Sequence, residues 1–193
     1  MKALPRPLLM MVTPCAADLA QRVAAAIAGG VEAVQLRDRA APPDRLAAAA
    51  AELASACRGR ALLVINGDAA LATACGADGV HWPESAPGTA FDGLIGRSVH
   101  SVDAAEAAEA DYLVAGSIWP TASHPGGRAG GLELLAAIVA AVDTPVLAIG
   151  GVTPARAAQC VAVGAAGVAV LSPLQTASDP QALAAAYMEA MRA

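Results

Sequence analysis

Aromatic and charged side chains are both scarce in this chain of 193 residues. Aromatic residues make up 3% and charged residues 15%, against about 25% charged residues in an ordinary soluble domain. Disordered chains combine low hydrophobicity with high net charge, whereas here 56% of the residues are apolar. With a net charge of −5, the chain lacks the excess of basic residues that is typical of nucleic-acid-binding proteins. With 53 alanines and few aromatics, the core must consist of small aliphatic side chains, which suits helices packed closely on a sheet.

Cysteine is sparse too, and no long apolar run is present. Four cysteines without a Cys-x-x-Cys pair are too few for a disulfide scaffold, so we expect reduced thiols acting as small hydrophobic groups. The apolar run Leu8–Val12 is too short for a secretory signal. No stretch reaches the roughly 20 apolar residues of a membrane-spanning helix. We therefore expect a cytoplasmic protein with neither a membrane nor a nucleic acid as partner.

Short apolar runs recur at regular intervals and alternate with alanine-rich segments of helical spacing. Most of the runs are continuous rather than alternating in polarity, which is typical of parallel strands covered on both faces. The runs are Leu8–Thr13, Ala33–Arg37, Ala61–Asn66, Gly79–Trp82, Leu94–Val99, Tyr112–Ser117, Pro145–Gly150 and Gly167–Ser172. Helix starts are marked at Thr153-Pro154 and Asp179-Pro180, where a capping residue precedes proline.

Eight strand candidates and about seven helices predict a compact (β/α)₈ barrel that occupies residues 1–193 as a single domain. One βα unit would take roughly 24 residues, enough for a short strand, a helix of about ten residues and two loops. The alternative is an open doubly wound sheet. It is disfavoured because no Gly-x-Gly-x-x-Gly follows the first strand candidate.

In such a barrel, ligands bind where the strands end, so the polar residues that close each apolar run are the candidate site. Gly150-Gly151 and Leu171-Ser172 follow the last two runs, and loops at these positions commonly bind phosphate. Glycine lets amide groups approach an anion, and a helix start adds partial positive charge. The alternative is a tight turn without a ligand. The other strand-end candidates are Gln35, Arg37, Asn66, His81, Ser98, His100 and Ser117.

Two of these candidates, and a further histidine in a loop, have competing interpretations. Arg37 ends an apolar run, so it must contact an anionic ligand or form a salt bridge to Asp38 or Glu32. His81 is either a ligand-binding residue or a structural histidine with satisfied hydrogen bonds. His124 lies in the long loop 120–131, which resembles an active-site lid, and is either catalytic or simply exposed.

Seven short motifs follow one another along the chain: Gln35-Leu36-Arg37, Val64-Ile65-Asn66, Gly76–His81, Ile95–Ser101, Pro120–Ser123, Ala148–Val152 and Gly167–Ser172. In these motifs and their order, the chain resembles the thiamine phosphate synthase/TenI family over nearly its whole length. The resemblance implies a (β/α)₈ barrel that binds a thiazole phosphate, with its phosphate at the loops after the last two strands.

Two activities occur in the family, and the residues of this chain depart from both. The synthase joins an aminopyrimidine diphosphate to the thiazole nitrogen and needs Mg²⁺ on the diphosphate. Its two metal-binding aspartates are replaced here by Gly67 and Ala86, although Asp68 and Glu84 lie close by in the sequence. The synthase lysine that lies two residues after the arginine of the second strand is replaced here by Arg39. The lysine of the synthase Thr-x-Thr-Lys loop is replaced by His124.

The TenI branch resembles this chain more closely at Arg37-x-Arg39, at Asn66-Gly67 and at Gly150–Pro154. Its members aromatise a carboxythiazole phosphate by moving a proton, which requires an acid/base group and no metal. The catalytic histidine of that branch is replaced here by Ser117, so His124 and His100 become the candidates for proton transfer.

The sequence therefore favours a TenI-like thiazole tautomerase without a metal or other cofactor, with the synthase and a non-catalytic thiazole-phosphate-binding protein as alternatives. Mg²⁺ is expected only if the synthase alternative holds. Family resemblance suggests a homodimer. The residues expected to catalyse are His124, His100 and Ser117; those expected to bind the substrate are Gln35, Arg37, Arg39, Asn66, His81, Ser98, Thr121 and Ser123; those expected to bind phosphate are Gly150, Gly151, Leu171 and Ser172.

Overall fold

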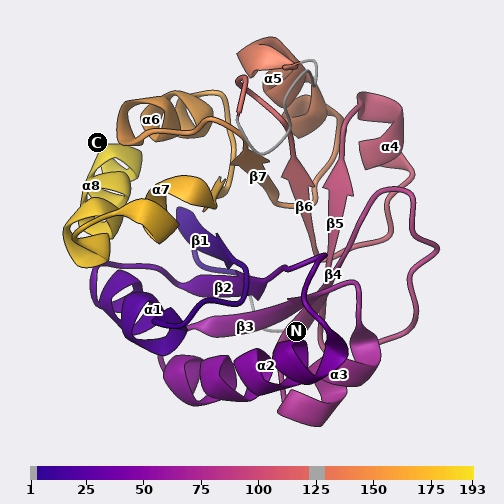
Figure 1. Ribbon diagram of the computed structural model, residues 1–193. Helices are drawn as coiled ribbons and strands as arrows, with labels where there is room; N and C mark the ends of the chain where they lie inside the picture. Colours follow the sequence, from indigo (N-terminus) through magenta and orange to yellow (C-terminus); the bar gives the residue numbers. More distant parts are fainter. Residues whose placement is uncertain (1–3, 122–128) are drawn as a thin grey trace.

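The computed structural model describes residues 4–121 and 129–193, and it shows a closed barrel of eight parallel strands surrounded by helices (Figure 1). Each strand pairs with the next along the chain, and β8 closes the barrel on β1. The predicted (β/α)₈ barrel is thus confirmed. The strands are β1 (Leu8–Thr13), β2 (Ala33–Leu36), β3 (Leu62–Asn66), β4 (Gly79–Trp82), β5 (Leu94–Val99), β6 (Tyr112–Ala115), β7 (Val146–Ile149) and β8 (Gly167–Val170).

Eight helices are found in the described part of the chain, one more than the sequence suggested. The additional helix, α7, follows β8 closely. Because it has only five residues, it shows no amphipathic period of its own. The helices are α1 (Leu19–Ala28), α2 (Pro43–Cys57), α3 (Ala69–Cys75), α4 (Val102–Glu106), α5 (Gly131–Ala141), α6 (Pro154–Ala162), α7 (Ser172–Thr176) and α8 (Pro180–Arg192).

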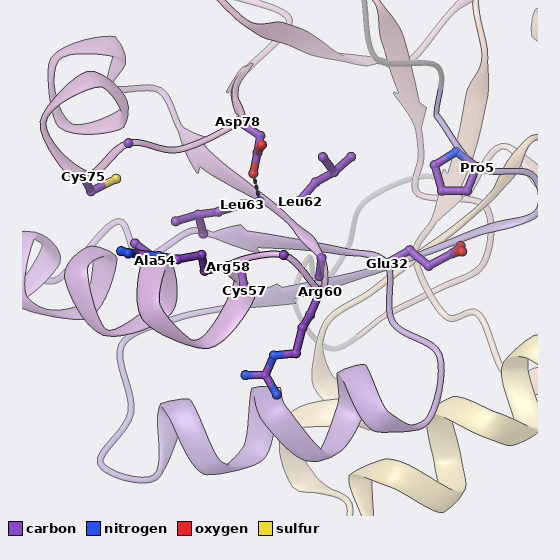
Figure 2. A pocket seen from close by; sticks show the side chains of 13 residues that line it. Pro5, Glu32, Ala54, Cys57, Arg58, Arg60, Leu62, Leu63, Cys75 and Asp78 are labelled. Carbon is purple, nitrogen blue, oxygen red and sulfur yellow. Dashed lines mark hydrogen bonds between the residues drawn. The ribbon is translucent and has the colours of Figure 1, made fainter.

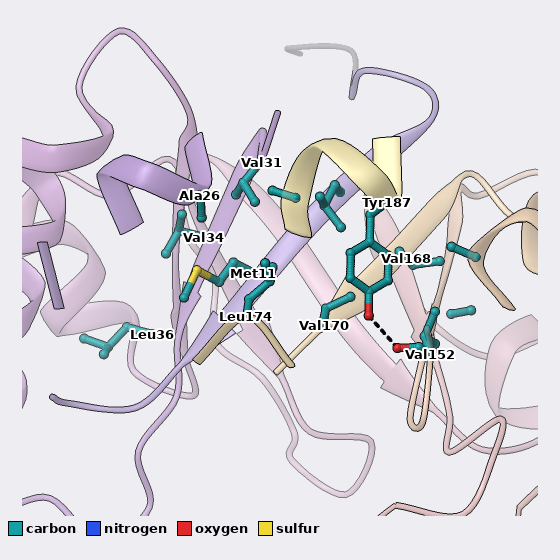
Figure 3. Packing of buried hydrophobic residues seen from close by; sticks show 14 of the residues in the cluster. Met11, Ala26, Val31, Val34, Leu36, Val152, Val168, Val170, Leu174 and Tyr187 are labelled. Carbon is teal, nitrogen blue, oxygen red and sulfur yellow. Dashed lines mark hydrogen bonds between the residues drawn. The ribbon is translucent and has the colours of Figure 1, made fainter. Parts of the chain in front are cut away.

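The side chains of β1 show how the barrel is filled. Leu8, Met10 and Val12 belong to a small inner cluster with Tyr112 of β6, whereas Leu9 and Met11 belong to the larger layer between the strands and the helices. This alternation is the two-residue period of a strand with both faces buried. Figure 3 shows part of the outer layer, in which Met11, Val34 and Val170 meet side chains of the surrounding helices.

Alanine lets the helices approach this small barrel closely. Ala26, Ala50, Ala157 and Ala184, on four different helices, are fully buried. All four cysteines are free thiols; Cys57 and Cys160 are buried, and Cys15 and Cys75 are half-buried. In the part of the chain that the structure describes, no helix is both long and apolar enough to cross a membrane.

The predicted helix starts and strand ends differ in accuracy. Thr153 caps α6 by accepting a hydrogen bond from the Arg156 amide, and Asp179 caps α8 in the same way, as predicted. The predicted runs extend too far at several carboxyl ends. Arg37, Ser117, Gly150 and Ser172 lie outside the strands because the chain there leaves the ladder and turns into the loops that form the site.

Candidate active site

A cavity of about 920 Å³ lies over the carboxyl ends of the strands. It brings together the predicted site residues that fall within the described ranges, although they come from separate strands and loops. Ser123 and His124 lie outside the described residues, so their predicted roles remain expectations. The predicted residues that line the cavity are Gln35, Arg37, Arg39, Asn66, His81, Ser98, His100, Ser117, Thr121, Gly150, Gly151, Leu171 and Ser172.

Two glycines shape one end of the cavity. Gly150 and Gly151 adopt φ values of +100° and +63°, which side chains of L-residues rarely adopt. A Cβ at Gly150 would lie 2.7 Å from the Ser117 Cβ, and one at Gly151 would lie 2.8 Å from the Pro120 carbonyl oxygen. Within the described ranges, the amides of Gly151 and Val152 have no acceptor. Such amides, with Leu171 and Ser172 also lining the cavity, form an arrangement suited to a phosphate.

Two arginines at the end of β2 supply positive charge to the cavity. Arg37 is half-buried, and burial, together with the charge of Arg39, lowers the pKa of its guanidinium below its usual value. The salt bridges considered as alternatives from the sequence are not seen among the described residues. The Asp38 carboxylate instead accepts hydrogen bonds from backbone amides, and Glu32 lies at the opposite end of the barrel. The guanidinium of Arg37 is therefore available to an anionic ligand.

The floor of the cavity carries two hydrogen-bonded groups of buried and half-buried polar side chains. Gln35 Nε2 donates to Asn66 Oδ1 at 3.0 Å. The two ring nitrogens of His81 lie 2.9 Å from the Ser98 hydroxyl and 3.3 Å from the Tyr112 hydroxyl. Burial, aided by the charges of Arg37 and Arg97, lowers the pKa of His81 to about 3. His81 is therefore neutral at physiological pH and is held as a satisfied structural histidine, although it also faces the ligand space.

The neutral state of His81 predicts a loss of stability in acid. Between pH 6.5 and about 3 the unfolded chain binds a proton at this residue and the folded chain does not. Folding stability should therefore fall as the pH decreases, by about 1.4 kcal/mol per pH unit for this group. Urea denaturation at pH 7 and pH 5 should show a drop in the free energy of unfolding that is roughly 2 kcal/mol larger in the wild type than in His81→Gln. An equal drop in both proteins would show that His81 titrates alike in the folded and unfolded states.

A hydrogen-bonded pair of side chains from two loops lies at the rim of the cavity. Glu84 Oε2 accepts hydrogen bonds from the backbone amide of His100 at 2.7 Å and from its Nδ1 at 2.8 Å. Arg97 steadies the loop that carries Glu84, because its Nη1 donates to the Ala86 carbonyl at 2.8 Å. The pair fixes Nδ1 of His100 toward Glu84 and leaves Nε2 for another partner. The sequence predicted His100 as a site residue but did not predict its hydrogen bonds with Glu84.

The described residues do not fit a magnesium ion. Asp68, one of the two possible substitutes for the missing aspartates, is exposed and caps α3 through the Leu71 amide at 2.8 Å. Glu84, the other, binds His100. Within the described ranges no three acidic, histidine or cysteine side chains gather into a group that could hold a metal. No step of a reaction is therefore assigned to a metal.

Several lining residues were not among the sequence predictions. They lie in the strands, in the loops that follow them and at the start of α5, and most have apolar or small side chains that gave no chemical signal in the sequence. Glu84 is the exception, because the sequence suggested it only as a substitute for a metal-binding aspartate. These lining residues are Val12, Pro83, Glu84, Ser85, Val114, Gly116, Pro120, Gly130, Leu134, Ile149, Val152, Thr153, Ala169, Val170 and Pro173.

A second cavity, of about 660 Å³, opens at the amino-terminal end of the barrel (Figure 2). Glu32 and Arg60 line it, but Figure 2 shows their side chains diverging from one another. The Arg60 guanidinium is bonded to the carbonyl oxygen of Ala56. Because its polar groups do not converge on a common point, this cavity is less suited to a ligand than the one at the carboxyl ends.

Comparisons with known proteins agree on one family. Residues 9–174 match the family model described as thiamine monophosphate synthase. A thiamine-phosphate synthase of Mycobacterium tuberculosis is 38% identical over 198 residues, covering 91% of this chain and 89% of that protein. A bifunctional thiamine biosynthesis protein of Symbiobacterium thermophilum is 39% identical over 180 residues, covering 87% of this chain but only 38% of that longer protein. The solved structure of thiamine phosphate pyrophosphorylase from Pyrococcus furiosus is 30% identical, with a TM-score of 0.84 and 97% and 96% of the two chains covered.

Proposed function

The chain belongs to the thiamine monophosphate synthase family, and we propose that it is a thiamine phosphate synthase acting in thiamine biosynthesis. The names of its relatives support this alternative over the TenI-like tautomerase that the sequence favoured, and the TenI preference is not confirmed by the comparisons. The observation that carries the proposal is a single cavity with two separate groups suited to anions: the glycine amides after β7 and the arginines after β2.

The proposed reaction joins two phosphorylated substrates. The lone pair of the thiazole nitrogen forms a bond to the exocyclic methylene carbon of the aminopyrimidine. The bond from that carbon to the diphosphate oxygen breaks, and its electron pair leaves with the diphosphate. The amides of Gly151 and Val152 would hold the thiazole phosphate, and Arg37 and Arg39 would bind the diphosphate. Fixed positive charge beside a leaving group stabilises the negative charge that develops on it in the transition state.

The polar floor of the cavity would orient the two rings. Gln35 and Asn66 are already bonded to each other, and His81 is held by Ser98 and Tyr112, so these groups are placed before substrate binds. Preorganised groups lose little entropy when the substrate arrives. Because His81 is neutral, it adds no third positive charge beside the two arginines.

The experiment is formation of thiamine phosphate from the two precursors, measured with EDTA and with added Mg²⁺. We expect product under both conditions, with rates within about threefold, because arginines rather than metal ligands face the leaving group. Product formed only with Mg²⁺ would contradict the arginine assignment. No product under either condition would reject the synthase proposal. Tight thiazole phosphate binding without product would favour the non-catalytic alternative.

The hydrogen bond between Glu84 and His100 favours the tautomerase as a second candidate. A carboxylate that fixes one ring nitrogen orients the imidazole for proton transfer at the other. His100 would then replace the TenI histidine, whose position here is Ser117. Incubation with the carboxythiazole phosphate tests this candidate: tautomerisation by the wild type and its loss in His100→Gln would support it, and an inactive wild type would reject it.

A further inference from the structure

Three consecutive carbonyl groups after β7 are each held by a donor from a different part of the chain. The Gly150 oxygen accepts from the Trp119 amide at 3.0 Å, and the Gly151 oxygen accepts from Arg156 Nη1 at 2.7 Å. The Val152 oxygen accepts from the Tyr187 hydroxyl at 2.7 Å, a bond that is drawn in Figure 3. The orientation of three successive peptide planes is therefore fixed from the loop after β6, from α6 and from α8.

The positions of the donors determine which way the amide groups face. Trp119, Arg156 and Tyr187 do not line the main cavity, whereas the backbone from Gly150 to Thr153 does. In a trans peptide the N–H points opposite to the C=O of the same plane. The three carbonyls point toward donors that lie away from the cavity. The N–H groups of the next residues, Gly151, Val152 and Thr153, therefore point toward the cavity. None of the three amides finds an acceptor in the described ranges.

Arg156 holds the middle of these planes, and it is the only charged group among the three donors. It lies in the first turn of α6, and its guanidinium carbon is 4.9 Å from the centre of the Trp119 ring. The same side chain thus contacts the loops after β6 and β7. A charge-assisted hydrogen bond and a cation–π contact are each stronger than a neutral contact at the same place.

We infer that Arg156 is a positioning residue that orients the peptide between Gly151 and Val152 so that its N–H faces a bound phosphate. The identity of the ligand as a phosphate rests on the proposed function. Glycine at 151 leaves this peptide with few steric barriers to rotation. If the bond to Arg156 is lost, a flipped peptide presents the Gly151 carbonyl oxygen to the anion in place of the Val152 amide. An attractive contact then becomes a repulsive one.

The test measures binding of inorganic phosphate and of thiazole phosphate to Arg156→Gln, at about 0.15 M and about 0.5 M salt. We expect the dissociation constants to rise roughly tenfold or more, because a hydrogen bond to an anion is lost. In a turnover assay the KM for the thiazole phosphate should rise while kcat stays within about twofold, because Arg156 touches no reacting atom. Arg58→Gln removes the same charge at the opposite end of the barrel and should leave binding unchanged.

Two measurements separate positioning from other roles. An amide spectrum of the wild type should show the Val152 resonance shifting on phosphate addition, and Arg156→Gln should lack that shift. Weakened binding that persists at the higher salt supports positioning, because long-range attraction is screened there. Wild-type affinity in the variant, or a defect that disappears at higher salt, would overturn the inference. A wild type that binds no phosphate would instead reject the phosphate site of the proposed function.

Discussion

Replacing Gly151 by alanine is expected to weaken the binding of thiazole phosphate about 100-fold. The added Cβ would lie 2.8 Å from both the Pro120 carbonyl oxygen and the Trp119 Cβ, so the loop must move. The φ value of +63° adds strain of about 1–2 kcal/mol for a residue with a side chain. Movement displaces the Gly151 and Val152 amides, and two weakened bonds to an anion cost roughly 3 kcal/mol, or about two powers of ten in affinity. Isothermal titration calorimetry measures this directly.

Gly59 provides a matched control for Gly151. It has nearly the same φ value, +68°, and no atom lies within 4 Å of the place where its Cβ would stand. Gly59→Ala should therefore carry a similar backbone strain and lower the stability by about 1–2 kcal/mol, while leaving ligand affinity unchanged. Equal affinities in Gly151→Ala and the wild type would contradict the assignment of this loop to phosphate.

Arg37→Gln is expected to lower kcat/KM for the aminopyrimidine diphosphate about 100-fold. The guanidinium is half-buried in the cavity and has no ion-pair partner in the part of the chain that the structure describes. Glutamine keeps a hydrogen-bond donor but removes the charge, and loss of charge-assisted bonds to a diphosphate costs roughly 2–3 kcal/mol. Steady-state kinetics with each substrate varied in turn gives the measurement.

Binding of the thiazole phosphate distinguishes the two anion-binding groups of the cavity, the amides after β7 and the arginines after β2. The affinity of Arg37→Gln for thiazole phosphate should change by less than about threefold, because its phosphate would sit among the amides after β7. Arg37→Lys retains the charge but lacks the paired N–H donors of a guanidinium, so it should restore part of the lost kcat/KM for the aminopyrimidine diphosphate. If thiazole phosphate binding falls as much as diphosphate binding does, the two anions are not separated as proposed.

The barrel was predictable because its determinants are local. Each apolar run is continuous where both faces of a strand are buried, and glycine, proline and capping residues mark the intervening helices. The strand ends were predicted less accurately. Residues such as Ser117 and Gly150 continue the apolar run in sequence, and only the closed ladder shows where pairing stops. The short helix α7 has too few residues to carry a periodic signal.

The site was predictable as a set of residues but not as a set of contacts. Parallel strands end at one face, so the side chains after them had to meet there. Which of them bond to each other depends on loop geometry. Glu84 and His100 lie 16 residues apart on different loops, and nothing in their spacing predicts the hydrogen bond between them. The contact of Arg156 with Gly151 is a bond to a backbone carbonyl, which side-chain identity alone does not reveal.

We propose that one cavity holds a thiazole phosphate by the amides after β7 and leaves the arginines after β2 to a second anion. A crystal structure with bound thiazole phosphate tests it most directly. We expect phosphate oxygens at about 2.7–3.2 Å from the amide nitrogens of Gly151 and Val152, with the Gly151 carbonyl still bonded to Arg156. A phosphate bound instead by Arg37 and Arg39, or amides of this loop turned away from it, would contradict this arrangement.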